Sequence, residues 1–414
     1  GLHTRSKTKP VHRQTCLSGK VTAAAAIMEL PLLDANKLCK QGEAVDFVMQ
    51  PTSVKAESQS YAAILQECAR SRDLRQGKRL HAHITRTGLE RDIFVGNNLI
   101  SMYVKCGSLV YARQVFDKMR ERNVITWNAM MAGYSGSGEN GEVVRLFCEM
   151  QRKQVTPNRP TFASILKACV ITADVERLHT LVIRKGFALD VNVASILVDV
   201  YVKSGGLFHA RQVFDEMPEK DVVTWTSMIT GYAQNENGDE ALEVFYDMCQ
   251  SGARPNNFTF ASALTACAGQ GAMEEGQAVH ASCIKTGVTS DTFVRSTLIT
   301  MYMKCGGIEE ACRLFEKMPE QNMVSWTAMI AGYMQNGCSE EALRFFHQMQ
   351  GMGLKCNQFT FASVLSACAN LRAIEEGKQV HTHVIKTGFE RAICVANALL
   401  TMYSKGKSTD DAVK

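Results

Sequence analysis

Hydrophobic residues along this chain recur at helical spacing, in two short stripes separated by a glycine. In the segment 93–123 the first stripe consists of Leu99, Ile100, Met102 and Tyr103. Gly107 then ends the helix, because glycine is the residue most often found just past a helix C-terminus. The second stripe consists of Ala112, Val115, Phe116 and Met119. Apolar residues three and four apart share one helix face, so the pattern predicts a helix, a short turn and a second helix, with both stripes in the core.

The same pair of stripes returns further along the chain at a long, regular interval. The second stripe has equivalents at Ala210, Val213, Phe214 and Met217, and again at Ala311, Leu314, Phe315 and Met318. Pro218 and Pro319 follow these segments and cannot extend them, since proline has no backbone N–H. Trp127, Trp225 and Trp326 mark the same period in TWNAMMAGY, TWTSMITGY and SWTAMIAGY, at spacings of 98 and 101 residues. Such a period predicts one extended solenoid of stacked helical repeats.

The long period divides into shorter units of two lengths. Segments 222–256 and 257–291 have 35 residues each and 292–322 has 31, while the preceding copy lacks three residues in ACVITADVERLH. The expected units are 58–92, 93–123, 124–158, 159–190, 191–221, 222–256, 257–291, 292–322, 323–357, 358–392 and a truncated 393–414. The 35-residue unit that precedes each 31-residue unit is called the middle unit below.

The two ends of the chain depart from this pattern. Segment 28–57 resembles a degenerate, shortened repeat, with LCKQG in place of a YVKCG helix stop and PTSVKAE as an inter-unit turn. Residues 1–27 carry five basic residues and no acid, a balance found in organelle transit peptides and also in disordered or cloning-derived leaders. Since the last unit stops 22 residues into a 31-residue pattern, the chain is expected to be a fragment.

Composition excludes some functions and leaves others open. An apolar content of 46% with only 8 prolines suits a mostly helical, well-buried protein. No uninterrupted apolar run approaches the length of about 18 residues that a membrane span needs, so no membrane partner is expected. A net charge of +5 permits a polyanionic partner without requiring one.

The cysteines and histidines occupy recurring slots, which favours structural roles. Of the 15 cysteines, the recurring ones include Cys106, Cys169, Cys267, Cys305 and Cys368. Corresponding slots lie a full repeat group apart and cannot pair, so we expect reduced thiols that act as small apolar residues. No CxxC occurs, and the histidines of HAH at 81–83 and HTH at 381–383 point in different directions on a helix. The sequence therefore predicts no metal and no cofactor.

The rotating motifs closely resemble those of a known family. Units of 35, 35 and 31 residues carry TWNxMIxGY, FTFASxLxACA and VxNALxxMYxKCGxxxxARxxFDxMPE in turn. Over 58–414 this alternation is similar to the PLS class of pentatricopeptide repeat proteins of land plants. The 34-residue pattern of tetratricopeptide repeats, the nearest helical rival, is absent.

The resemblance implies an all-α fold, a right-handed α-solenoid superhelix whose first helices line a groove for single-stranded RNA, with one base per repeat. In the family the fifth and last residues of a repeat recognise the base, and the second packs between bases. The expected recognition pairs are Asn97 with Asn123, Asn128 with Asn158, Ser195 with Asp221, Thr226 with Asn256, Ser296 with Asn322, and Thr327 with Asn357, and Asn397 begins another. The expected packing residues are Phe94, Ile125, Val223, Phe293 and Val324, while Pro160 and Asn192 depart from the apolar pattern.

The recognition pairs carry a chemical preference. An ionised Asp only accepts hydrogen bonds and so must face a donating base edge, as in G or U, whereas Asn can donate to the ring acceptors of A and C. The family adds that Ser or Thr at the fifth position goes with purines and Asn with pyrimidines. The expected ligand is 5′-YYNGANAANY-3′, where Y is a pyrimidine and N any base. The middle units have alanine at the fifth position and should tolerate several bases; these residues are Ala62, Ala163, Ala261 and Ala362.

A lysine recurs near the end of the first helix of each 31-residue unit. The residues are Lys105, Lys203, Lys304 and Lys405. A cation at this place complements the helix dipole, which would explain it structurally. The family resemblance suggests contact with RNA phosphates as the alternative.

The sequence contains no motif for catalysis. Relatives of this class often end in a zinc deaminase domain that edits C to U, which needs an HxE motif and a CxxC; neither is present. No P-loop or GxSxG occurs either, so the chain itself is not expected to be an enzyme. The leading hypothesis is recognition of single-stranded RNA in chloroplasts or mitochondria, with an editing deaminase or accessory factor supplied in trans. The alternatives are a helical scaffold that binds a peptide or protein, and a fragment without a cellular role.

Overall fold

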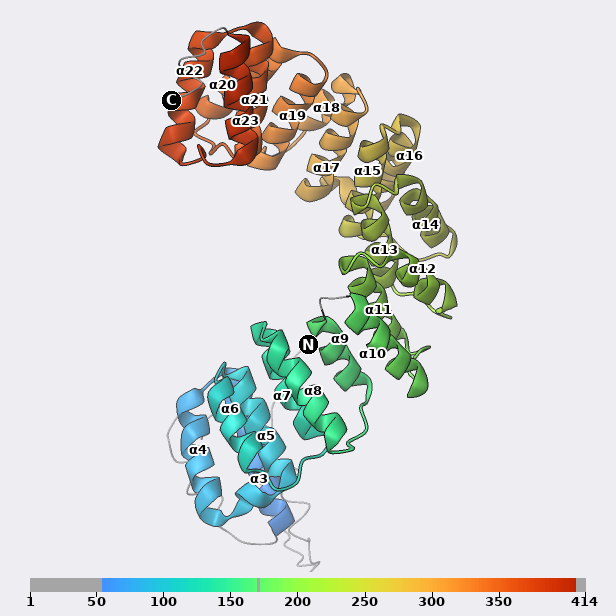
Figure 1. Ribbon diagram of the computed structural model, residues 1–414, viewed down its shortest axis with the longest axis vertical. Coiled ribbons are helices and arrows are strands. Elements are labelled where there is room, and N and C mark those ends of the chain that lie inside the picture. Colours follow the sequence, from blue (N-terminus) through green and yellow to red (C-terminus); the bar gives the residue numbers. More distant parts are fainter. Residues whose placement is uncertain (1–53, 170–171, 407–414) are drawn as a thin grey trace, which may run out of the picture. The chain divides into compact units, whose positions relative to one another are not determined.

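In the computed structural model, residues 54–169 and 172–406 are described. They form 21 α-helices, α3 to α23, and two short 3₁₀ helices, η1 (Leu89–Arg91) and η2 (Val288–Ser290), and no strand occurs among them (Figure 1). The expectation of an all-α solenoid of helical repeats is confirmed, and the handedness of its superhelix stays a prediction. The expected leader 1–27, most of the degenerate repeat 28–57 and the end of the last unit lie outside the described residues.

The helices alternate between two kinds, one at the start of each unit and one that returns along it. The first helices are α3 (Val54–Ser71), α5 (Ile93–Lys105), α7 (Val124–Ser137), α9 (Arg159–Ala168), α11 (Val191–Lys203), α13 (Val222–Gln234), α15 (Asn257–Gln270), α17 (Thr292–Lys304), α19 (Met323–Gln335), α21 (Gln358–Leu371) and α23 (Ile393–Lys405). The second helices are α4 (Leu74–Thr87), α6 (Leu109–Lys118), α8 (Asn140–Arg152), α10 (Thr172–Arg184), α12 (Leu207–Glu216), α14 (Gly238–Gln250), α16 (Met273–Thr286), α18 (Ile308–Glu316), α20 (Ser339–Gly351) and α22 (Ile374–Thr387).

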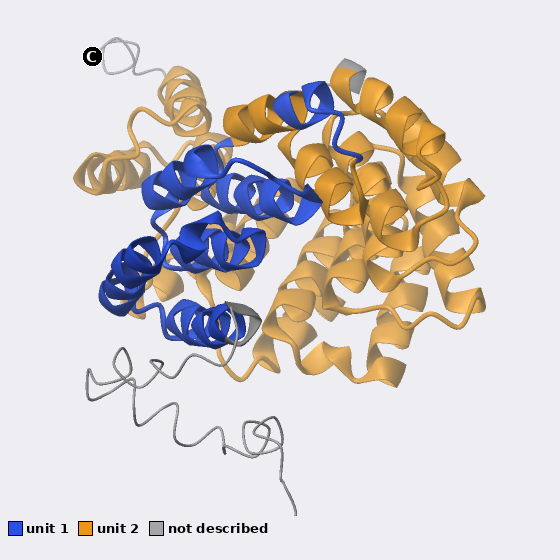
Figure 2. Ribbon diagram, turned by 90° about the horizontal axis from the view of Figure 1, so that it is seen from below, with its two compact units in different colours: residues 1–139, 149–156 blue, residues 140–148, 157–414 orange. Residues whose placement is uncertain are grey.

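The helices belong to two compact units (Figure 2). One contains residues 1–139 and 149–156, and the other contains 140–148 and 157–414. Within the first, α3, α5 and α7 pack side by side in a row; within the second, the row runs from α9 to α23, each first helix contacting the next. Neighbouring first helices thus pack on one another in each unit, and second helices such as α14, α16 and α18 pack on first helices.

One expectation about the start of the array is wrong. The PTSVKAE segment was expected to be an inter-unit turn, but α3 begins at Val54, four residues before the expected unit boundary at Ser58. No glycine or proline follows Pro51 in this segment, and its Lys, Ala and Glu are good helix formers. Glu57 also lies in the first turn, where a negative charge complements the helix dipole.

The three tryptophans join consecutive repeats. Each indole ring meets, edge to face, a phenylalanine from the preceding second helix, with ring centroids 4.8–4.9 Å apart. The pairs are Phe116 with Trp127, Phe214 with Trp225, and Phe315 with Trp326. These residues are all buried, as are the stripes expected in 93–123. Such aromatic pairs add about 0.5–1.5 kcal/mol to the burial of their apolar area.

The recurring histidines form a hydrogen bond between each middle unit and the unit that follows it. Nδ1 of His81 and of His280 lies 2.8 Å from the hydroxyl of Tyr103 and of Tyr302. The same contact joins His179 to Tyr201 at 3.1 Å and His381 to Tyr403 at 2.9 Å. Burial lowers the pKa of His81, His179 and His280, which favours the neutral imidazole at these positions. Burial also raises the pKa of Tyr103 and Tyr201 to about 12. The hydroxyls therefore stay protonated and able to donate.

The HAH and HTH motifs do not form metal sites in the described residues. His83 binds the hydroxyl of Tyr61 in α3, whereas His81 turns to Tyr103 in α5. No group of three His, Cys, Asp or Glu side chains capable of holding a metal occurs in residues 54–169 and 172–406. All thirteen cysteines of this part are free, and burial raises the pKa of the Cys267 and Cys368 thiols to about 12. No helix there is long and apolar enough to cross a membrane.

Close packing of second helix on first helix depends on a glycine and a methionine. A Cβ on Gly77, Gly276 or Gly377 would lie only 2.5–2.7 Å from the sulfur of Met102, Met301 or Met402. In the unit 159–190, Val175 stands where the other units have this glycine. Val200, in the next unit, stands where they have the methionine, and both valines are buried. Small and large side chains are thus paired in three copies, and the fourth uses two of medium size.

We expect Gly276→Ala to destabilise the protein by about 1–3 kcal/mol, the usual cost of overpacking a core, because Met301 would have to move. Gly269→Ala is the matched control: it lies in α15 of the same compact unit, where an added Cβ meets nothing within 4 Å. Urea unfolding followed by circular dichroism measures both. Equal stabilities of the two variants would contradict this packing argument.

Candidate functional site

Each expected last-position residue is the N-cap of the following first helix. The residues and helices are Asn123 of α7, Asn158 of α9, Asp221 of α13, Asn256 of α15, Asn322 of α19 and Asn357 of α21. In each case the side-chain oxygen accepts a hydrogen bond from the backbone N–H of the third residue of the next unit. This bond satisfies one of the N–H groups left open at a helix start.

Capping fixes which atom each of these side chains presents to solvent. Oδ1 of Asn256 accepts the N–H of Thr259 at 2.9 Å, and only an oxygen can accept it. The amide nitrogen Nδ2 is therefore turned away from the helix end, as a donor. Asp221 uses Oδ1 to accept from Thr224 N at 2.8 Å and from Thr224 Oγ1 at 2.6 Å. Its second oxygen is left as an acceptor, so the Asn and Asp caps offer opposite hydrogen-bonding character.

The structure brings fifth- and last-position residues together within each compact unit. Asn97 Nδ2 donates to Asn123 Oδ1 at 3.3 Å, and Asn357 Nδ2 donates to Thr327 Oγ1 at 3.4 Å. Asn128 and Asn158 belong to different compact units, so their pairing stays a prediction. Asn397 is exposed on α23.

The two fifth-position serines are more deeply buried than the two fifth-position threonines. Ser195 is 7% exposed and Ser296 is 3% exposed, whereas Thr226 and Thr327 are partly exposed. Both serine hydroxyls donate to the carbonyl four residues earlier, on Val191 and Thr292. These two oxygens are therefore less accessible than those of Thr226 and Thr327.

A third residue type, missed by the sequence reasoning, lies beside each cap. The third residue of the following unit is a fully buried Thr or Ser; these residues are Thr126, Thr161, Thr224, Thr259, Ser325 and Thr360. Thr259 Oγ1 lies 2.7 Å from Thr226 Oγ1, and Thr224 Oγ1 lies 2.6 Å from Ser195 Oγ. An Asn or Asp followed three residues later by Thr or Ser, before an apolar run, could have revealed this capping arrangement.

The second-position residues form an exposed apolar stripe beside the caps. The fractional exposures are 49% for Phe94, 59% for Ile125, 63% for Val223, 53% for Phe293 and 53% for Val324. The sequence reasoning missed Phe258 and Phe359, the same slot in two middle units, which are 67% and 59% exposed. The ring centroids of Phe258 and Phe293 lie 5.9 Å apart, so these two members of the stripe contact each other. Large apolar side chains left in solvent at a repeating position indicate a binding surface.

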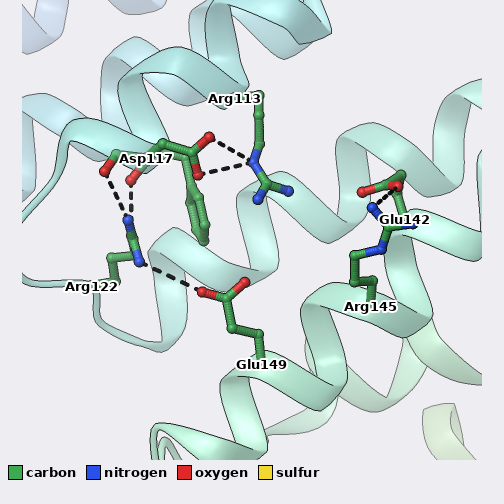
Figure 3. A network of polar contacts seen from close by, with 7 residues as sticks. Arg113, Asp117, Arg122, Glu142, Arg145 and Glu149 are labelled. Atoms are coloured by element: carbon green, nitrogen blue, oxygen red, sulfur yellow. Dashed lines mark hydrogen bonds and ion pairs between the residues drawn. The ribbon is translucent and has the colours of Figure 1, made fainter.

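In the 31-residue units, the residue before the cap binds backbone carbonyls at the end of the second helix. Arg122 Nε donates to Phe116 O at 2.8 Å, Arg122 Nη2 donates to Asp117 O, and its guanidinium lies 4.4 Å from the Phe116 ring centre (Figure 3). Lys220 Nζ and Gln321 Nε2 likewise donate to Met217 O and Phe315 O. The end of one repeat is thereby held close to the start of the next, which restricts where the cap can lie.

The recurring lysines are each the last residue of a first helix and are exposed. Lys203 Nζ pairs with Asp199 of the same helix at 2.7 Å, and Lys405 Nζ donates to Asn370 Oδ1 at 3.0 Å. Their place agrees with the dipole explanation. Phosphate contact by Lys105, Lys203, Lys304 and Lys405 stays a prediction.

Family comparisons agree with the repeat geometry. A sequence model described as "PPR repeat family" matches residues 122–170, 220–269 and 321–370, and one described as "PPR repeat" matches 97–124, 193–222 and 293–323. The chain belongs to the pentatricopeptide repeat family. The matched segments alternate along the chain and together cover more than half of it.

Several pentatricopeptide repeat proteins of Arabidopsis thaliana are similar over most of the chain. At1g15510, described as chloroplastic, is 39% identical over 84% of this chain and 41% of its own length. At3g53360, described as mitochondrial, is 33% identical over 94% of this chain and 52% of its own length. At1g03540 is 35% identical over 97% of this chain and 66% of its own length. The chain thus spans about half the length of the curated relatives it matches.

Solved structures of this family are also similar. The pentatricopeptide repeat protein PPR10 from maize shares 17% identity with a TM-score of 0.44, covering 92% of this chain and 64% of that chain. Its complex with an 18-nt psaJ RNA element gives the same identity and TM-score and covers 70% of that chain.

Proposed function

We propose that this chain binds single-stranded RNA sequence-specifically, one base per repeat, as a PLS-class pentatricopeptide repeat array in chloroplasts or mitochondria. Relatives described as chloroplastic and as mitochondrial support the location. The unit boundaries listed from 58–92 to 393–414 are part of the proposal. The helical repeat is the framework on which this family of repeats recognises bases through two or three side chains each.

The observation that carries the proposal is the exposed second-position stripe. Val223, Phe258, Phe293, Val324 and Phe359 follow one another on five consecutive first helices of one compact unit, each more than half exposed. N-capping requires no apolar residue at this place, so the stripe has no structural explanation. Bases stack on such side chains whatever their identity, which gives affinity without sequence preference.

We attribute the preference for particular bases to the residues at the fifth and last positions. N-capping alone explains an Asn or Asp in the last position, because both are strong N-cap residues and the middle-unit caps Asp92, Asp190 and Asp291 show the same choice. N-capping does not explain whether the last residue is Asn, which offers a donor, or Asp, which offers an acceptor. It also does not explain which fifth-position residue accompanies each. On that basis we propose the ligand 5′-YYNGANAANY-3′, with G at Ser195 and Asp221 and A at Thr226 and Asn256.

The most direct change to this preference is at the fifth position. Thr226→Asn with Thr327→Asn should move two bases from A towards pyrimidine, because Asn at the fifth position goes with pyrimidines in this family and Thr with purines. We expect a roughly tenfold change of preference at each base. Affinity for RNAs that differ only at these bases measures it.

Thr230→Asn is the matched control, the same exchange one turn further along α13. It should leave the preference unchanged. A shift produced equally by the control, or none in the double variant, would contradict the assignment of Thr226 and Thr327.

We further propose that the chain selects the target of an RNA editing or processing factor and performs no chemistry itself. A deaminase or accessory factor, on the same polypeptide or in trans, would act on the bound RNA. Binding of a peptide instead of RNA would favour the scaffold alternative; in that case substitutions at Asn256 or Thr226 would change no base preference.

A further inference from the structure

In four repeats a buried third-position hydroxyl connects two recognition residues of the repeat before it; these hydroxyls belong to Thr126, Thr224, Thr259 and Thr360. Thr259 lies between Thr226 and Asn256, and its Oγ1 is 2.7 Å from Thr226 Oγ1 and 3.0 Å from Asn256 Oδ1. Thr360 holds the same place between Thr327 and Asn357, at 2.9 and 3.1 Å. In the other compact unit, Thr126 Oγ1 lies 2.7 Å from Asn97 Oδ1 and 3.0 Å from Asn123 Oδ1.

The available hydroxyl protons determine whether the fifth residue offers a base a donor or an acceptor. Thr226 has one hydroxyl proton, and its Oγ1 lies 2.7 Å from Val222 O, which can only accept. The short contact between Thr226 and Thr259 can use the proton of either hydroxyl, because Thr259 Oγ1 also lies 3.0 Å from Asn256 Oδ1, which only accepts. In either arrangement the proton of Thr226 is directed to Val222 O or to Thr259 Oγ1, so the lone pair that Thr226 leaves for a base is an acceptor. Asn256 stays capped through the backbone N–H of Thr259 at 2.9 Å.

An acceptor on Thr226 beside a donor on Asn256 complements one base edge in particular. Adenine offers a donor at N6 and a ring acceptor next to it, whereas guanine offers the opposite order at O6 and N1. The third-position hydroxyl thus fixes the polarity of a residue that could otherwise rotate to serve either purine.

We propose that the third-position hydroxyl of the following repeat is a positioning residue for base recognition. It sets the hydroxyl direction of the fifth residue and holds that residue beside the cap, without touching the RNA. This inference rests on the proposed RNA-binding function. It extends the recognition unit across the repeat boundary, because each base would depend on three side chains from two repeats.

One recognition pair in the chain lacks this contact to the third-position hydroxyl. At the pair Ser296 and Asn322 the third position is Ser325, whose Oγ donates to Asn322 O at 2.9 Å. Ser296 Oγ donates to Thr292 O at 2.8 Å. These two hydroxyls are directed to separate backbone carbonyls, so Ser296 lacks the constraint that Thr259 gives Thr226. The unit 292–322 should therefore discriminate between A and G less strongly than the unit 222–256.

The test compares Thr259→Val with Thr259→Ser. Valine keeps the shape and removes the hydroxyl, while serine keeps the hydroxyl. Affinities are measured for the RNA 5′-YYNGANAANY-3′ and for RNAs with G at the base of Thr226 or at the base of Thr327. We expect the preference for A at the Thr226 base to fall from roughly tenfold to about twofold in Thr259→Val and to be restored in Thr259→Ser. The preference at the Thr327 base should stay unchanged.

A purely structural role gives a different result. Loss of stability alone would weaken binding of all these RNAs equally and leave both preferences intact, which would overturn the proposal. Ser325→Thr serves as the reverse variant and should sharpen the preference at the Ser296 base about threefold to tenfold. It tests the proposal even if Thr259→Val fails to fold, and no sharpening would then overturn it. Absence of RNA binding by the unaltered chain would instead overturn the proposed function.

Discussion

Replacing Phe258, Phe293 and Phe359 together by alanine is expected to weaken RNA binding at least hundredfold, with little change in base preference. The three rings are more than half exposed and lie at the second position of their repeats. Stacking of a base on an aromatic side chain contributes about 1–3 kcal/mol, and the contributions of three separate repeats should largely add. Fluorescence anisotropy with the proposed RNA and its single-base variants measures both affinity and preference.

Three exposed apolar residues on second helices provide the matched control for this variant. Phe208, Ile284 and Ile385 are 78%, 60% and 56% exposed but lie away from the second-position stripe. Their combined replacement by alanine should leave RNA affinity within about twofold, because surface positions without a partner contribute little. If both triple variants lost affinity equally, the stripe would not be the base-packing surface.

Trp326→Ala is expected to cause the largest loss of stability of any single substitution, about 3–5 kcal/mol. The indole is 3% exposed and lies between Phe315 at 4.8 Å and Phe345 at 5.6 Å, measured between ring centroids. Removing it leaves a cavity between two repeats and separates α18 from α19. Unfolding in urea, followed by circular dichroism, gives the free-energy change.

Trp326→Phe is the informative companion. Phenylalanine retains an aromatic ring against Phe315, and it removes the indole Nε1, which is buried without a hydrogen-bond partner within the described residues. We therefore expect a loss well below half of that of Trp326→Ala, because an unpaired buried N–H is itself costly. Similar losses in the two variants would show that shape, rather than the aromatic contact, determines stability here.

The sequence predicted the helices and the core because both follow from repetition. Phe116 with Trp127, and Phe214 with Trp225, occur at the same distance in the chain, and each pair meets in the same way. Repeated apolar spacing is the strongest local signal of helix structure. The start of α3 was missed because the first unit has no copy before it against which its boundary could be set.

The candidate site was predicted less completely, for physical reasons. Phe258 and Phe359 were not predicted, because the alanine at the fifth position of their units offers no group that could recognise a base, although their second position matches the others. The link from Thr259 to Thr226 depends on how two helices from different repeats approach. Thr259 and Ser325 look equivalent in sequence, yet their hydroxyls have different partners. Such differences arise from tertiary geometry, which local pattern does not encode.

The most direct test of the central claim is a competition assay. The chain is bound to a labelled RNA containing 5′-YYNGANAANY-3′ and challenged with the same unlabelled RNA or with a scrambled RNA of equal composition. One-base-per-repeat recognition predicts that the matched RNA competes at least tenfold better, since each recognised base contributes roughly 1–3 kcal/mol. Equal competition by the scrambled RNA would contradict base recognition by these residues.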